Sequence, residues 1–409
     1  MSALLRLLPE KQDISAEIAV SAARAAAAQP LAPGSDDVKK YCGDLSALLL
    51  GSAEARSYPE LQALGFWLRP ASVDSMVKKF LSSPRTAIGI AFHMPPSNVA
   101  TLFGYTSSIA LLCGNAVLVR LPSAENPVQT LLVSLMQEAL AQNSRALRER
   151  LILLRYGHDD AVTSELSRAC QLRMVWGSDE TVEHISALPL PAAARHVSFG
   201  DRYSAMALKA AAWLRLNSEE RNDVIKQIFN DIYVFDQLAC ASPRLLVWVG
   251  DEKTAAQAAE DFYPRLASCA KARGYMPGAG ESIAKQNTNF LALHDLAVAA
   301  YTNYGPQLTV LALTGFEGLS TFKKVNYGYG TLLAVRLETL AEFAPHTEAR
   351  DQTLSCWGFA EDEMQAFAGA GKRRGFDRMV AAGQALTFDP VWDGCNLFDA
   401  MTRPIGKRP

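Results

Sequence analysis

The sequence of 409 residues lacks the signatures of several common protein classes. Its seven cysteines are widely spaced and include no CxxC pair, which argues against a disulfide framework and a structural zinc site and favours a reducing cytoplasm. The six histidines never fall at the HxxxH spacing of metal ligands, so we expect no metal. Neither GxGxxG nor GxxxxGK(S/T) occurs, which excludes a standard dinucleotide fingerprint and a P-loop.

An excess of charge of one sign is also missing. Forty Lys and Arg residues against forty-two Asp and Glu residues give a net charge of −2. We therefore expect no partnership with nucleic acid, because a strong basic field is absent. At the start of the chain, Glu10 and Lys11 follow too short an apolar stretch for a signal peptide.

One uncharged run, residues 100–119, approaches the length of a membrane span. It contains the turn signal Gly114-Asn115 and then changes to the β-branched sequence AVLV. This pattern is typical of a buried helix, a turn and a buried strand, so we expect no membrane span.

The chain does contain an alternation of apolar strands and helices. Apolar residues make up 49% of the sequence and charged residues 20%, as in soluble globular proteins, and the length suggests two or three domains. Strands are predicted at residues 86–94, 115–121, 150–156 and 172–177, with helices at 126–142 and 160–170. This order predicts a parallel sheet covered by helices on both faces.

A second α/β series begins near Arg195. Further strands are predicted at residues 243–251, 307–315 and 330–340, and further helices at 253–273 and 360–371. We place the domains at residues 1–198 and 199–345, with residues 346–409 packing back on the core. No long linker separates the two series, so we expect them to pack closely.

The first candidate site follows the first predicted strand. There Pro95 and Pro96 lead through Ser97 and Asn98 into the uncharged helix. Asn98 is either a helix cap or a side-chain amide donor at the carboxyl end of a parallel strand, where open α/β sheets bind ligands. The local chemistry favours neither interpretation.

Two further segments also have a structural and a functional interpretation. Cys240 lies among small residues in FDQLACASPR, and is either a buried small hydrophobe or a nucleophile. Gly177 and Ser178 end a strand and begin a helix. Ser178 is then a helix cap, or the helix N-terminus meets the pyrophosphate of a cofactor.

Taken in order, these segments resemble the aldehyde dehydrogenase superfamily, and within it the acyl-CoA reductases of the bacterial luminescence (LuxC) type. Residues 95–123 are similar to the superfamily's catalytic-asparagine segment, with its GN turn and adenosine-binding strand. Residues 375–403, beginning GFDRMVAAGQALTF, are close to the luminescence-type reductases in particular. The resemblance covers nearly all of the chain from about residue 80. It implies an α/β fold with a Rossmann-like cofactor domain and a catalytic thiol domain.

The resemblance also implies a role for single residues. Cys240 takes the place of the catalytic thiol and Asn98 that of the oxyanion donor. Residues implied to bind a nicotinamide cofactor are Arg120 and Ser123 at the adenosine, Gly177 and Ser178 at the pyrophosphate, and Tyr304 at the nicotinamide ribose. Because Arg120 stands where the superfamily usually has a lysine, its guanidinium suits the 2′-phosphate of NADPH.

One departure from the superfamily pattern is informative. Hydrolysing aldehyde dehydrogenases carry a glutamate that activates water, and here Ser198 stands at the corresponding position in HVSFGDRYS. Asp201 could substitute for that base, although we favour a structural role for it. The loss of the base is expected where the acyl-enzyme exchanges with a thiol rather than with water.

The function implied is the NADPH-dependent reduction of a fatty-acyl thioester to an aldehyde through an S-acyl-cysteine. Fatty-acyl-CoA or an acyl-carrying partner protein would donate the acyl group. The alternatives are a cofactor-independent acyltransferase or thioesterase that uses the same cysteine, and a non-catalytic subunit of a fatty-acid reductase complex. We also expect a homo-oligomer, and an acyl-protein synthetase-like protein is a candidate partner.

Overall fold

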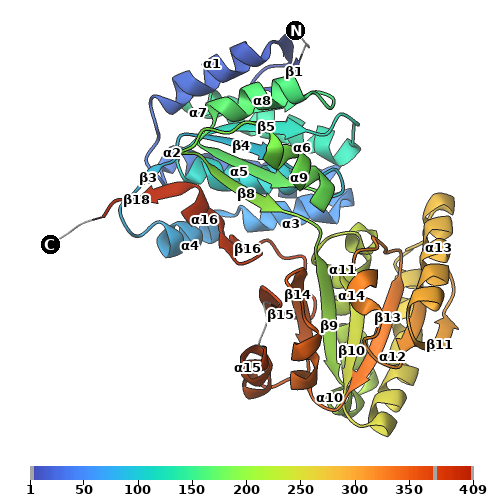
Figure 1. Ribbon diagram of the computed structural model, residues 1–409. Coiled ribbons are helices and arrows are strands. Elements are labelled where there is room, and N and C mark those ends of the chain that lie inside the picture. The colour runs from blue at the N-terminus through green and yellow to red at the C-terminus, as the bar shows by residue number, and fades with distance from the viewer. Residues whose placement is uncertain (1–3, 372–374, 407–409) are drawn as a thin grey trace. The chain divides into compact units, whose positions relative to one another are not determined.

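The computed structural model describes residues 4–371 and 375–406 and divides into two compact units (Figure 1). Unit 1 comprises Met1–Gly200 and Phe388–Pro409, and unit 2 comprises Asp201–Thr387. The terminal segment 346–409 is thus shared between the units. Each unit contains a seven-stranded, mostly parallel sheet with helices, so the predicted α/β fold class is confirmed.

The sheet of unit 1 has the strand order β2-β1-β6-β5-β4-β7-β8. Its strands are β1 (Leu4–Leu8), β2 (Gln12–Ile14), β4 (Ile90–Met94), β5 (Ala116–Leu121), β6 (Leu151–Arg155), β7 (Leu172–Trp176) and β8 (Arg195–Phe199). The five strands from β6 to β8 are parallel, and β1 is antiparallel to β6. The short strand β3 (Arg85–Ala87) pairs outside this sheet with β18 (Thr402–Pro404).

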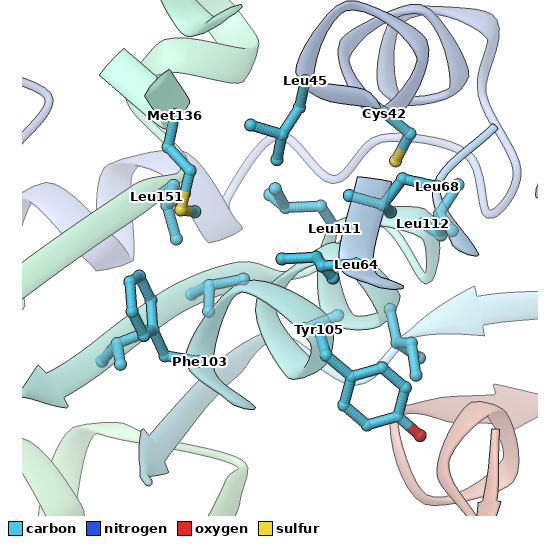
Figure 2. Close-up of a cluster of buried hydrophobic side chains, with 14 of the residues drawn as sticks. Cys42, Leu45, Leu64, Leu68, Phe103, Tyr105, Leu111, Leu112, Met136 and Leu151 are labelled. Carbon is cyan, nitrogen blue, oxygen red and sulfur yellow. The ribbon is translucent and has the colours of Figure 1, made fainter. Parts of the chain in front are cut away.

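Helices cover both faces of this sheet, as predicted. One face packs against α1 (Ala16–Ala27), α8 (Asp160–Ala169) and α9 (Asp179–Ala187). The other packs against α2 (Asp36–Gly51), α3 (Pro59–Trp67), α4 (Pro70–Phe80), α5 (Leu102–Leu112), α6 (Pro127–Ala141), α7 (Arg145–Arg148) and α16 (Leu397–Ala400). Figure 2 shows how Leu45, Leu64, Phe103 and Met136 from four of these helices meet in one apolar cluster. The remaining elements of unit 1 are η1 (Ala55–Ser57), β16 (Val391–Trp392) and β17 (Cys395–Asn396).

The uncharged run forms α5 and β5, which are joined by a tight turn. Every residue of α5 is buried. Gly114 has a φ of 84°, and a Cβ there would lie 2.1 Å from the carbonyl oxygen of Leu31, so only glycine fits. The Asn115 side chain accepts from the backbone N–H groups of Ile88 and Gly89. The predicted helix, turn and strand are therefore confirmed, and no helix in residues 4–371 or 375–406 is long and apolar enough to cross a membrane.

The sheet of unit 2 has the strand order β11-β12-β13-β10-β9-β14-β15. Its strands are β9 (Tyr203–Lys209), β10 (Pro243–Val249), β11 (Val298–Asn303), β12 (Thr309–Leu313), β13 (Thr331–Leu337), β14 (Asp351–Trp357) and β15 (Arg378–Ala381). All are parallel except the edge strand β11, which is antiparallel to β12.

Helices again cover both faces of this second sheet. One apolar cluster involves α10 (Ala210–Arg215), α11 (Ser218–Tyr233) and α12 (Glu252–Ala272). The other involves α13 (Ala279–Asp295), α14 (Leu319–Phe322), η3 (Leu340–His346) and α15 (Glu361–Ala370). The amino-terminal ends of the parallel strands share one edge of the sheet, and the loop with Cys240 lies there.

Candidate active site

Cys240 lies on a short loop between η2 (Val234–Gln237) and the start of β10, and is half-buried. We refer to residues 238–242 as the Cys240 loop. Tyr203 and Asp351 begin the neighbouring parallel strands β9 and β14 at the same edge of the sheet. The residue predicted to be the nucleophile is therefore partly exposed and lies at the edge of the sheet where the parallel strands begin.

The backbone that leads into the Cys240 loop is strained. Phe235, Asp236 and Gln237 have φ angles of 62°, 53° and 64°, in the left-handed region that residues with a side chain rarely adopt. Each such residue costs roughly 1–2 kcal/mol relative to the right-handed conformation. Strain of this kind persists only where surrounding contacts fix the backbone, and it is concentrated at functional sites.

The side chain of Gln237 provides such contacts. It is fully buried, and its amide nitrogen donates to the carbonyl oxygens of Pro243 at 2.8 Å and Thr331 at 2.9 Å. Its amide oxygen accepts from the backbone N–H of Gly330 at 3.1 Å. Because Gln237 and Pro243 flank the Cys240 loop, the bond between them ties the two ends of the loop together.

A glycine-rich segment packs against the strained turn. The backbone N–H of Tyr329 donates to the carbonyl oxygen of Asp236 at 2.9 Å. A Cβ on Gly328 would lie 2.4 Å from that same oxygen, and a Cβ on Gly330 would lie 1.9 Å from the carbonyl oxygen of Gln307. The glycines in NYGYG thus permit a close approach of backbone to backbone that other residues would block.

Ser204 on β9 holds the Cys240 loop from a second side. Its buried hydroxyl donates to the carbonyl oxygen of Cys240 at 2.7 Å and accepts from the backbone N–H of Thr353 at 3.2 Å. Sequence reasoning did not identify Gln237 or Ser204. Gln237 stands within the quoted motif FDQLACASPR, but no local pattern marks the contacts of its side chain.

The remaining cysteines are poor nucleophiles. Burial raises the pKa of the thiols of Cys42, Cys113, Cys170, Cys269, Cys356 and Cys395. A thiol must lose its proton to attack a carbonyl group, so a raised pKa lowers its reactivity.

Asn98 lies in unit 1, on the exposed part of the loop between β4 and α5. The helix begins with Thr101 as its N-cap residue, so the alternative that Asn98 caps this helix is wrong. In the sheet, β4 lies between β5 and β7, and the exposed Ser123 follows the carboxyl end of β5. Both residues are therefore placed at the edge where open α/β sheets bind ligands.

Gly177 and Ser178 follow β7 at that same edge. Ser178 accepts from the backbone N–H of Thr181 at 3.2 Å, which confirms that it caps α9. A Cβ on Gly177 would lie 3.0 Å from the Cβ of Thr181, so the turn is tight. Contact of these residues with a pyrophosphate stays a prediction.

Arg120 is the penultimate residue of β5. Its Nη2 donates to the carbonyl oxygen of Gly157 at 3.2 Å, and its Cζ lies 5.0 Å from the centroid of the Tyr156 ring. Arg155, which ends β6, pairs with Glu125 at 2.8 Å. No carboxylate in the described part of the chain pairs with Arg120, so its charge remains available to an anion.

Tyr304 lies in unit 2, in the loop between β11 and β12. Its backbone N–H donates to the carbonyl oxygen of Leu308 at 2.9 Å, and its ring centroid lies 5.9 Å from that of Tyr263. Burial raises the pKa of Tyr304. Because β11 is antiparallel to β12, this loop lies at the same edge of the sheet as the Cys240 loop.

The residues considered for activating water are both exposed. Ser198 lies on β8, the edge strand of unit 1, opposite Val175 of β7. Asp201 is the first residue of unit 2 and interacts electrostatically with the buried Arg244. Within the described ranges, no group of three His, Cys, Asp or Glu side chains could hold a metal ion.

Comparisons with known proteins identify the family and the fold. A search of curated proteins gave no match. The family acyl-CoA reductase (LuxC) matches residues 69–300, which is more than half of the chain.

Similar solved structures share the fold. An NAD-dependent aldehyde dehydrogenase from Sinorhizobium meliloti has a TM-score of 0.68 at 12% identity, over 95% of this chain and 85% of that one. A glyceraldehyde-3-phosphate dehydrogenase from Methanocaldococcus jannaschii, complexed with NADP, has a TM-score of 0.65 at 13% identity, over 95% of this chain and 92% of that one. The chain therefore belongs to the acyl-CoA reductase (LuxC) family, and it is an oxidoreductase that acts on aldehyde or oxo groups.

Proposed function

We propose that this protein reduces a fatty-acyl thioester to the aldehyde, with NADPH as reductant and with the acyl group held on Cys240. The construction of the Cys240 loop is the observation that supports this proposal. Three left-handed residues, the buried Gln237 side chain and the Ser204 hydroxyl fix the backbone around this one cysteine. A partly exposed thiol on a fixed backbone suits nucleophilic attack.

In the first half of the reaction, the Cys240 thiolate attacks the thioester carbonyl carbon. The Asn98 side-chain amide and the Cys240 backbone N–H donate hydrogen bonds to the oxyanion that forms. The carbon–sulfur bond to the leaving thiol then breaks. The thiol of CoA, or of an acyl-carrying partner protein, departs and leaves the acyl group on Cys240.

The residues at the carboxyl edge of the unit 1 sheet fit a dinucleotide. The first turn of α9, which Ser178 caps, would offer its remaining backbone N–H groups to a pyrophosphate. Arg120 and Ser123 would bind the adenosine end, and Tyr304 of unit 2 would bind the nicotinamide ribose. When bound, the reduced nicotinamide supplies the hydride that converts the acyl-enzyme to a thiohemiacetal, which releases the aldehyde.

The cofactor preference is proposed from the charge of Arg120. A 2′-phosphate distinguishes NADPH from NADH, and a guanidinium binds phosphate through charge-assisted hydrogen bonds. Arg120 has no carboxylate partner among the described residues, in contrast to the neighbouring Arg155. We therefore propose NADPH as the preferred cofactor.

We infer that the protein forms a homo-oligomer. Helix α13 exposes the apolar side chains of Ile283 and Phe290, at 64% and 67% of their surface. The next element, the edge strand β11, exposes Tyr301 and contains no charged residue. Soluble monomers rarely leave an uncharged edge strand uncovered beside a helix that exposes several large apolar side chains. Light scattering after size-exclusion chromatography tests this inference, and a monomeric mass would contradict it.

The function is tested with a panel of acyl-CoA chain lengths, each supplied with NADPH or NADH. Absorbance of the nicotinamide and formation of aldehyde are followed together, and covalent labelling by radioactive acyl-CoA is measured separately. Cys240→Ala should abolish both labelling and aldehyde formation, whereas the control Cys269→Ala should retain both.

Each alternative function has its own outcome in this experiment. Labelling of Cys240 without oxidation of either cofactor would support the acyltransferase or thioesterase. No labelling of the wild-type protein would support the non-catalytic subunit. Stable labelling of the Cys240→Ala variant would overturn the proposed mechanism.

A further inference from the structure

Arg244 has an unusual place at the end of the Cys240 loop. On β10, Pro243 pairs with Ser204 of β9 and Leu245 pairs with Ala205, so Arg244 is an additional residue without a partner on β9. An extra residue of this kind locally redirects a side chain, and such irregularities are frequent next to active sites. The irregularity lies four positions after Cys240.

The side chain of Arg244 is buried, with 5% of its residue surface exposed. Its Nη2 donates to Oδ1 of Asn326 at 2.8 Å, and its Cζ lies 5.4 Å from the centroid of the Tyr327 ring. Both contacts favour a cation, but neither neutralises its charge. Among the described residues, no group accepts a hydrogen bond from Nε of Arg244.

The charge of Arg244 has no carboxylate counterpart within ion-pair distance in the described part of the chain. Two other cations of this unit are buried. Lys323 pairs with the buried Asp351 at 2.8 Å, and Lys285 donates to the carbonyl oxygen of Pro306 at 2.9 Å. Buried cations are normally paired, since an uncompensated charge in the protein interior is costly. The surroundings of Arg244 therefore favour the arrival of an anion.

Four groups interact electrostatically with the Arg244 guanidinium: Tyr327, Tyr203, Cys240 and Asp201. Burial raises the pKa of both tyrosines, so these phenols stay neutral at neutral pH. Asp201 is exposed, and solvent screens its charge. Of the four groups, Cys240 alone is a partly buried acid whose anion the proposed mechanism requires.

We propose that Arg244 is the counter-charge that stabilises the thiolate of Cys240. The thiol proton passes to solvent, and the thiolate remains beside the fixed guanidinium. Because Ser198 stands where a general base is expected, a buried cation provides another means of keeping the nucleophile ionised at neutral pH. This inference rests on the proposed function, in which Cys240 attacks the thioester.

The test measures the rate at which iodoacetamide alkylates Cys240, from pH 5 to pH 10, by mass spectrometry of the Cys240 peptide. Arg244→Met removes the charge and keeps an apolar volume, a type of replacement that buried charges often tolerate. Its midpoint of alkylation should rise by at least about one pH unit, which lowers the rate about tenfold at pH values well below the wild-type midpoint. Arg244→Lys should restore most of the wild-type profile. The control is Arg336→Met, which removes an exposed arginine paired with Glu338 and should leave the midpoint unchanged.

The proposal is overturned if Arg244→Met folds and the pH midpoint of its Cys240 alkylation equals that of the wild type. If KM for acyl-CoA rises in the same variant, Arg244 is a substrate-binding residue instead. If Arg244→Met does not fold, Arg244→Gln decides. This change removes the charge and keeps an amide donor near Asn326, so the midpoint should rise, and an unchanged midpoint contradicts the proposal. Failure of the proposed function is detected by a different measurement. If the Cys240→Ala variant is still acylated, Cys240 is not the nucleophile. That result would leave the effect of Arg244 on the alkylation of Cys240 unchanged.

Discussion

The side-chain amide of Gln237 donates a hydrogen bond of 2.8 Å to the carbonyl oxygen of Pro243, across the loop that carries Cys240. The backbone of Gln237 is itself left-handed, with a φ of 64°. The same side chain therefore stabilises a strained turn and fixes both ends of the Cys240 loop. A local substitution there should affect the placement of the thiol more than the binding of cofactor.

We predict that Gln237→Met slows acylation of Cys240 at least tenfold, with little change in KM for NADPH. Methionine fills a similar volume but leaves the carbonyl oxygens of Pro243 and Thr331 without their buried donor. The free energy of unfolding should fall by about 2–4 kcal/mol, since each unsatisfied buried group costs about 1–3 kcal/mol. Rapid-quench labelling and urea denaturation measure the two effects. Gln286→Met, at an exposed position of α13, is the control, and wild-type acylation by Gln237→Met would refute the prediction.

A second prediction concerns the close approach of backbone at Gly330. Gly330→Ala should lower the free energy of unfolding by more than about 3 kcal/mol, because its Cβ would overlap the carbonyl oxygen of Gln307 and its φ is 75°. Gly369→Ala is the matched control in helix α15, where a Cβ meets nothing within 4 Å. That change should raise stability by about 0.5–1 kcal/mol. Equal effects in urea denaturation would show that Gly330 has no special conformational role.

Much of the fold could be predicted from the sequence. Its central strands are continuous apolar runs, and the helices between them begin at polar residues. The prediction missed α13, and the reason is physical. This helix buries the polar residues Lys285 and Asn289 and exposes the apolar Ile283 and Phe290, so its pattern is inverted relative to a helix that packs by its apolar face. The edge strand β11 was missed with it.

The candidate site could be predicted only in part. Cys240 and Asn98 were identified as candidates through the order of motifs along the chain, because neither residue is distinctive by its local chemistry. The roles of Gln237 and Ser204 depend on contacts with strands that are distant in sequence. Three successive left-handed residues that include Phe235 also contradict local preference, so tertiary contacts alone explain them.

A third prediction concerns pH and the buried Asp231, near the end of the helix that leads into the strained turn. Burial raises the pKa of Asp231 to about 6, although hydrogen bonds from Ser355, Gly383 and Ala385 oppose this rise. The pKa in the unfolded chain is about 3.9, so the folded state binds the proton more tightly. The resulting stability is full below about pH 4 and is lost as the pH rises through 6.

Comparison with Asp231→Asn isolates this contribution. The free energy of unfolding is measured for the wild type and for the variant, and the variant's value is subtracted. This difference should fall by about 2–3 kcal/mol between pH 4 and pH 7. Asp223→Asn, which removes an exposed carboxylate from the same helix, is the control for the loss of a charge. A constant difference for Asp231→Asn would show that its pKa is the same in the folded and unfolded states.

A fourth prediction separates the two nicotinamide cofactors. Arg120→Ala should raise KM for NADPH about 10–100-fold and change KM for NADH little, because a charge-assisted contact to the 2′-phosphate is lost. Arg155→Ala, on the adjacent strand end, removes an arginine that already pairs with Glu125 and should change neither constant. An unchanged ratio of the two KM values in Arg120→Ala would remove Arg120 from the cofactor site.

The last prediction concerns the lifetime of the acyl-enzyme, and it follows from Ser198. A thioester hydrolyses slowly unless a base removes a proton from the attacking water, and general-base help is typically worth about 10²–10⁴-fold. A serine hydroxyl has no basic pKa near neutrality, so the acyl group on Cys240 should persist without cofactor. NADPH should discharge it to aldehyde, and free thiols should discharge it to a new thioester.

Isolation of labelled acyl-enzyme and timing of its decay in buffer measure this lifetime directly. Ser198→Glu supplies the carboxylate found in hydrolysing relatives and should speed release of free acid, whereas Ser198→Gln, of similar size but without a basic group, should not. Asp201→Asn should leave the lifetime unchanged if this carboxylate is structural. Rapid release of fatty acid by the wild type, at a rate near the reductase turnover, would mean that another group activates water. Loss of that release in Asp201→Asn would then identify Asp201 as the base.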